Sequence, residues 1–290
     1  MKTIYASLTG RSGDRPVMET ALLLNRLLGA TADFHHVRLD PATITRLGRT
    51  TPFSASYLIN EQLIEMANDA RERAERAQLA CENFIRTHGK EIVSTGSAQP
   101  TFTWTELTGI DTDETIAKSR VYDLLVLGRD AEMHYRGRDR LGAVVMDCGR
   151  PVLIVPEKAP PASLCDTIVV AWKDRAEAAR ALTAAAPLLA KAKRIIAVHI
   201  SEGTPAAGKK ASAVEQLGAQ LRKNGYPVEV REANFDAGTV AGQLRAVVAE
   251  TNADLLVSGA YGHSRLRELI LGGVTEELID NCAVPVLLFH

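Results

Sequence analysis

The strongest constraint on this chain is an internal repeat. The residues at 123–126, DLLV, return 131 positions later at 254–257, and each copy reaches a glycine two residues further on, Gly128 and Gly259. A similarity at one long period indicates that the same structural unit occurs twice in one chain. With 290 residues to divide, we expect two units of about 150 residues that share a fold.

The offset between the two copies changes along the chain. It is 163 between His36-Val37 and His199-Ile200 but 131 at the DLLV runs, so the first half carries 32 additional residues. They fall around 41–90, where 54–88 reads as one or two amphipathic helices with a charge-rich side that faces either solvent or a partner. Prolines within 157–163 mark the joint between an N-terminal domain, residues 1–157, and a C-terminal domain, residues 164–290.

Each half alternates strand-like and helix-like segments. Continuous apolar runs indicate buried strands, and the segments between them have helical periodicity. This alternation predicts an α/β fold in which each half is a mainly parallel five-stranded sheet with helices on both faces. In the second half we expect strands at 167–172, 194–200, 228–232, 254–258 and 284–289, and helices at 177–189, 211–223, 239–250 and one ending at 281.

Composition excludes several classes of protein. The 34 basic and 35 acidic residues nearly cancel, which argues against nucleic-acid binding. No apolar run approaches the ~18 residues needed to cross a bilayer, so we expect no membrane partner. The cysteines are scattered, without the spacing of a zinc site or a disulfide framework, and indicate reduced, partly buried thiols of a cytoplasmic protein. They are Cys81, Cys148, Cys165 and Cys282.

The most informative motif follows the fourth strand of the second half. Its spacing is G-x2-G-x9-G-G-V-T, and it comprises Gly259, Gly262, Gly272, Gly273, Val274 and Thr275. Glycines let the main chain approach an anion closely, and the helix that opens after Gly273 offers free N–H groups and the positive end of its dipole. Thr275 adds a hydroxyl. The motif therefore predicts a phosphate site at the carboxyl ends of the strands, where open parallel sheets bind ligands.

With this motif, the opening strand at 168–172 and the tandem layout, the chain resembles a two-domain universal stress protein. The resemblance implies two flavodoxin-like, adenine-nucleotide-hydrolase-like domains. It further implies ATP or a related adenine nucleotide as the ligand, with Mg²⁺ as an optional companion, and pairing of the domains through the last strands at 151–155 and 285–289. Whole chains could pair further as a homodimer.

Carried over by position, the resemblance assigns a role to each residue of the motif. Gly259 and Gly262 border the ribose and phosphates, and Gly272, Gly273, Val274 and Thr275 cradle the phosphates. Ser258 flanks the nucleotide, while Ala171 and Ile200 line the adenine slot. The chain departs from the family pattern twice. Gly273 stands where the family has Ser or Thr, and Lys173, followed by Asp174, replaces an acidic residue.

The first half has lost the motif. Gly128 is followed by Arg129, and no second glycine comes three residues after Gly128. Four arginines crowd this loop: Arg129, Arg136, Arg138 and Arg140. We expect no ATP in this half, although the arginines could hold a different anion.

Two other patterns are read as decoys. The stretch 203–210 nearly fits a P-loop but ends in Lys210, without the hydroxyl that binds Mg²⁺. His35-His36 could suggest a metal site but is read as core or rim histidines, because neighbouring strand residues point to opposite faces.

Nothing in the sequence has the placement of a general base, so no catalytic residue and no metal site are assigned. The sequence favours a stress-associated sensor or adaptor that binds adenine nucleotide. A slow ATPase using the same site and a protein-interaction module without nucleotide remain as alternatives.

Overall fold

A ten-stranded sheet runs through the computed structural model. The strands lie in the order β3-β2-β1-β4-β5-β10-β9-β6-β7-β8, so each half has the same internal order. The structure describes residues 1–40, 56–92, 101–129, 136–157, 162–201, 212–234, 238–262 and 273–290. The N-terminal half contains β1 Thr3–Ser7, β2 Thr31–Leu39, β3 Phe102–Gly109, β4 Leu124–Gly128 and β5 Val152–Val155. The C-terminal half contains β6 Thr167–Ala171, β7 Arg194–Ser201, β8 Val228–Asn234, β9 Leu255–Gly259 and β10 Val286–Phe289.

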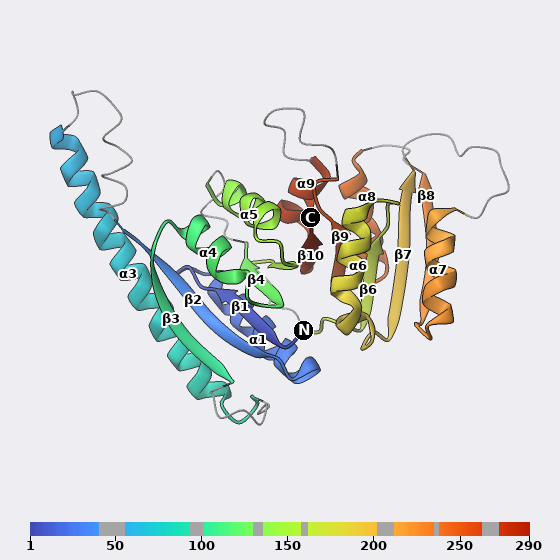
Figure 1. The fold of residues 1–290 in the computed structure, drawn as a ribbon, viewed down its shortest axis with the longest axis horizontal. Helices are drawn as coiled ribbons and strands as arrows, with labels where there is room; N and C mark the ends of the chain where they lie inside the picture. Colours follow the sequence, from blue (N-terminus) through green and yellow to red (C-terminus); the bar gives the residue numbers. More distant parts are fainter. Residues whose placement is uncertain are drawn as a thin grey trace.

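Helices cover both faces of the sheet, as the alternating pattern predicted (Figure 1). One face is packed by α1 Asp14–Leu28, α3 Ser56–His88, α6 Ala176–Leu189 and α7 Ala213–Lys223. The other is packed by α4 Asp111–Ser119, α5 Arg136–Asp147, α8 Val240–Glu250 and α9 Gly273–Asn281. The predicted α/β class, with mainly parallel sheets, is confirmed.

The two copies of the sequence repeat make equivalent hydrogen bonds. The Asp123 carboxylate accepts from the main-chain N–H groups of Lys2 and Thr3, just before β1 and at its start. The equivalent carboxylate, on Asp254, accepts from two N–H groups at the start of β6 in the same way. Both aspartates therefore tie the first strand of their half to the fourth, which explains why this residue precedes the DLLV-type strand in both copies.

The additional residues of the N-terminal half do not form a separate described element. Helix α3 has 33 residues and connects β2 to β3, the place that the 11-residue α7 takes between β7 and β8. Of the two predicted possibilities, one helix is correct. Its buried residues recur on one side, and its charged residues face outward, as expected for an amphipathic helix. The buried ones are Ala70, Ala74, Ala77, Cys81 and Phe84.

The two halves meet through their last strands, as predicted. Strands β5 and β10 pair antiparallel, with Leu287 opposite Leu153, whereas the pairs within each half are parallel. Because the central pair is antiparallel, the carboxyl edge of one half lies on the same side of the sheet as the amino edge of the other. Any ligand sites of the two halves therefore lie at opposite edges.

The histidines and cysteines singled out in the sequence are core residues. His35 stacks on Tyr5 at 4.3 Å between ring centroids, and the His36 Nδ1 lies 2.9 Å from the Leu8 carbonyl oxygen. The four cysteines are buried and unpaired by disulfides. Among the described residues, no cluster of His, Cys, Asp or Glu is placed to hold a metal ion.

The central strand pair can be tested by a truncation. Leu287 is fully buried in β10, so Leu287→Ala should cost about 2–5 kcal/mol of unfolding free energy through lost burial and a cavity. The measurement is urea unfolding. As a control, Leu79→Ala on α3, at a position 60% exposed, should change stability by less than about 0.5 kcal/mol. Equal losses in both variants contradict the assignment.

A second prediction concerns pH. Burial lowers the pKa of His35 from 6.5 to about 4, a shift that nearby Asp33 only partly offsets. Neutral His35 is therefore favoured in the folded state, and its contribution is complete above pH 6.5. As pH falls toward about 4, up to about 1.4 kcal/mol of stability is lost per pH unit. Urea unfolding of wild type and His35→Gln should show a smaller loss in the variant, which keeps only the contribution of His36, whose pKa is also lowered by burial.

Candidate functional site

The predicted base-slot residues come together at the carboxyl edge of the C-terminal half. Ala171 ends β6 and pairs in register with Ser258 of β9, while Ile200 lies near the end of neighbouring β7. Alternation along the strands places all three on the face covered by α8 and α9. Ile200 and Ser258 are buried, and Ala171 is partly buried. The arrangement leaves small side chains at the ends of β6 and β9.

Gly259 has a structural role that the motif did not reveal. It ends β9 and faces α6, on the side of the sheet opposite Ser258. A Cβ at this position would lie 2.7 Å from the Ala178 nitrogen and 2.8 Å from the Glu177 carbonyl carbon. Gly128 plays the same part in the N-terminal half, where a Cβ would lie 3.0 Å from the Gly13 oxygen. Helix packing therefore explains this glycine in both halves, independently of any ligand.

The hydroxyls of Thr275 and of Ser258, which precedes the motif, already have partners in the protein. Thr275 is buried, and its Oγ1 accepts from the Tyr261 N–H at 3.3 Å, so it braces the glycine loop. Ser258 Oγ donates to the Gly259 carbonyl oxygen at 2.9 Å. Tyr261 itself takes a left-handed conformation with φ of 55°, which is uncommon for a residue with a side chain. The main chain at Tyr261 is thus held by Thr275.

The remaining motif residues offer open main chain. A Cβ at Gly273 would meet nothing within 4 Å, and one at Gly262 would meet only the Glu177 carboxylate, at 3.5 Å. Gly273 and Val274 begin α9 and are exposed. The first N–H groups of a helix have no partner within it and face the positive end of its dipole. Gly272 and the near P-loop at 203–210 lie outside the described residues.

Polar atoms that the sequence did not single out also lie near this edge, on both faces of the sheet. Burial without a hydrogen-bond partner is costly, and buried polar atoms normally have one. Four side-chain atoms of described residues near the carboxyl ends of the strands have none: Trp172 Nε1, Glu177 Oε2, Gln243 Oε1 and Tyr261 Oη. Burial also raises the pKa of Tyr261 to about 12, so its hydroxyl stays protonated and able to donate. No residue pattern marks these four in advance.

The corresponding place in the N-terminal half is filled. Arg140 on α5 is only 7% exposed, and its guanidinium donates to Ser7 Oγ, at the end of β1, at 2.8 Å. Its Nε lies 2.5 Å from the Asp111 carboxylate at the start of α4. Ser7 is the counterpart of Ala171, so an internal ion pair stands beside the strand end that is small and neutral in the other half.

The arginine cluster predicted for the N-terminal loop is therefore corrected in two members. Arg140 is committed to Asp111 and Ser7, and Arg129 donates to the carbonyls of Ile279 and Cys282 in the other half. The side chains of Arg136 and Arg138 lie outside the described residues.

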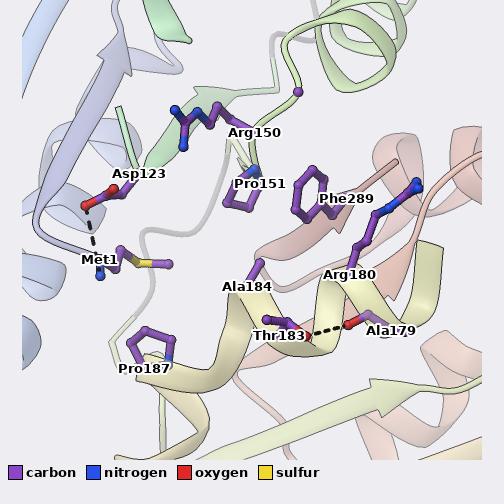
Figure 2. A pocket seen from close by; sticks show the side chains of 11 residues that line it. Met1, Asp123, Arg150, Pro151, Ala179, Arg180, Thr183, Ala184, Pro187 and Phe289 are labelled. Carbon is purple, nitrogen blue, oxygen red and sulfur yellow. Dashed lines mark hydrogen bonds and ion pairs between the residues drawn. The ribbon is translucent and has the colours of Figure 1, made fainter. Parts of the chain in front are cut away.

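A separate crevice of about 510 Å³ opens between the halves (Figure 2). Its walls come from the amino edge of the N-terminal half and from the outer side of α6. Figure 2 shows Arg150 and Arg180 on its two sides, with Pro151 and Phe289 between them. None of the predicted nucleotide residues lines it, so the crevice is not the glycine site.

The two glycine roles can be separated by substitution. Gly259→Ala should cost about 1–3 kcal/mol, because its Cβ would press on the main chain of α6. Gly273→Ala should stay within about 0.5 kcal/mol of wild type, because its Cβ enters open space. Thermal and urea unfolding measure both. A neutral Gly259→Ala would disprove the packing role.

Comparison with known proteins agrees with the fold. Residues 165–290 match the model of the Universal stress protein family. A curated universal stress protein of Synechocystis sp. is 27% identical over 180 residues, a match that spans 58% of this chain and 58% of the relative. The chain thus covers less than two thirds of that relative's length. No described helix has the length and apolar character needed to cross a membrane.

Solved structures extend the likeness over the whole chain. A universal stress protein from Archaeoglobus fulgidus has a TM-score of 0.72 at 21% identity, with 99% of this chain and 95% of that chain covered. A candidate universal stress protein from Pseudomonas aeruginosa has a TM-score of 0.59 at 11% identity, covering 100% and 93%. At these identities the likeness concerns the fold. The C-terminal half thus matches the universal stress protein family, and both halves together share its fold.

Proposed function

We propose that the C-terminal half binds ATP at its carboxyl edge and that the chain acts as a stress-associated sensor or adaptor. The observation that carries this proposal is the pair of open glycines, Gly262 and Gly273, beside the free N–H groups that begin α9. Close main-chain approach and a helix N-terminus are what a phosphate chain requires. The family match over 165–290 covers this same segment.

The described residues fit the parts of an adenine nucleotide. The main chain at Gly262, Gly273 and Val274 would face the phosphates, and Ala171 with Ile200 would line the slot for the base. The buried donors Trp172 Nε1 and Tyr261 Oη could bond acceptor atoms of the ligand. Bound nucleotide would supply phosphate charge to the start of α9 and a base to bury between the strand ends.

Glu177 favours the magnesium complex over bare ATP. Its carboxylate would lie within 4 Å of a Cβ at Gly262, and Oε2 has no hydrogen-bond partner among the described residues. A carboxylate beside a triphosphate repels it, unless a divalent cation lies between them. We therefore expect Mg²⁺ to strengthen binding.

The N-terminal half is proposed not to bind ATP. Its Arg140–Asp111 ion pair fills the place beside the end of β1, and the Asp111 carboxylate adds negative charge there. A ligand phosphate would have to break a buried pair to enter, which is costly. The stoichiometry should be one nucleotide per chain.

The proposal is tested by isothermal titration of the purified chain with MgATP. Wild type should bind one equivalent. Gly262→Val should lose most of the affinity, because the valine side chain would occupy the space of the phosphates. The fold should be kept, because Gly262 is exposed. Denaturing the purified protein and identifying released nucleotide by mass spectrometry gives an independent reading.

The matched control lies in the other half. Gly142→Ala on α5 should leave the affinity unchanged, whatever it does to stability. Two equivalents per chain, or equal losses from both variants, would contradict a single C-terminal site. No binding by wild type would favour the interaction module. Phosphate release with Mg²⁺ would show the slow ATPase.

A further inference from the structure

Arg129 joins the two halves at one end of α9. It is the residue that follows the strand-ending Gly128 and interrupts the glycine loop of the N-terminal half. Its Nη1 donates to the carbonyl oxygens of Ile279 at 3.1 Å and Cys282 at 3.0 Å. Both carbonyls lie at the C-terminal end of α9, which ends at Asn281. A side chain of the N-terminal half therefore caps the C-terminal end of a helix in the C-terminal half.

The sheet topology makes this contact possible. The antiparallel β5–β10 pair places the carboxyl end of β4 on the same side as the C-terminal end of α9. The counterpart of Arg129 is Ala260: their main-chain N–H groups donate to the equivalent oxygens of Val155 and Phe289. The alanine side chain has no donor with which to cap a helix of the N-terminal half. The capping contact therefore runs only from the N-terminal half to the C-terminal half.

The helix that Arg129 caps is the one whose first residues lie at the candidate phosphate site. It has nine residues, and helices of this length are not stable alone, so it depends on tertiary contacts and on its ends. The last carbonyls of a helix lack intrahelical partners and carry negative partial charge. A half-buried guanidinium that donates to two of these carbonyls gives them hydrogen-bond partners and places a positive charge beside their negative partial charge. The lost solvation of Arg129 lowers its pKa, but arginine stays charged at neutral pH.

We propose that Arg129 is a positioning residue for nucleotide binding: it holds α9 in place from its C-terminal end, so the degenerate N-terminal half sets the affinity of the other half. This inference rests on the proposed ATP site. Without the cap, α9 frays, and ATP must reorder it before its N–H groups can bind phosphate. The loss of a partly buried charge at a helix C-terminus should weaken binding about fivefold to tenfold.

The experiment compares three variants of the full chain by MgATP titration. Arg129→Ala should weaken binding about fivefold to tenfold, and Arg129→Lys, which keeps a cation and several donors, should recover most of it. Arg150→Ala is the matched control. Arg150 is also half-buried and donates through Nε to a carbonyl, that of Arg120, but within its own half. The ATP affinity of Arg150→Ala should equal that of wild type.

Amide hydrogen exchange separates positioning from general stability. In Arg129→Ala without ATP, exchange should quicken in the peptide covering 273–282 and stay unchanged at β1 and α1. Saturating ATP should restore protection. Unchanged affinity in Arg129→Ala, equal loss in Arg150→Ala, or faster exchange throughout the chain overturns the inference.

The two proposals fail in distinguishable ways. If wild type binds no ATP, the proposed function is wrong, and the link from Arg129 to the nucleotide falls with it. If wild type binds one ATP and Arg129→Ala binds equally well, only the positioning role is wrong.

Discussion

The antiparallel pairing of β5 with β10 is the contact on which the rest of the structure depends. It turns two five-stranded sheets into one and removes an apolar edge from each, which would otherwise invite association with other chains. It also fixes geometry. The two carboxyl edges face opposite ways, so Arg129, at the end of β4, lies against the C-terminal end of α9 rather than beside the start of that helix.

The two halves share one topology but differ at the end of their first strand. At the end of β1, Ser7 accepts from the buried Arg140, which is neutralised by Asp111. At the end of β6, Ala171 leaves that position small, and nearby glycines leave main chain open. A buried guanidinium must have an anion, and in the N-terminal half the protein supplies it from α4. In the C-terminal half we propose that the anion is the phosphate of a ligand, which binds the N–H groups at the start of α9.

The glycine motif shows how far residue patterns reach. Its spacing indicated a strand, a tight loop and a helix start, and β9 and α9 lie where that spacing put them. The reason for each glycine could not be read the same way. Gly259 is needed because α6 packs on it, although α6 is some 80 residues earlier in the chain. Thr275 braces Tyr261, which the sequence spacing alone did not suggest.

The sequence by itself determined the repeat, the alternation of strands and helices, and the glycine segment. These features follow from local periodicity and from similarity between the halves, which are written along the chain. Tertiary structure alone decided that Glu177 borders the glycine loop, that Arg140 is neutralised by Asp111, and that Arg129 caps α9. Those contacts join residues 29 to 153 positions apart, and a side chain's partner over such distances is set by packing, which no local pattern records.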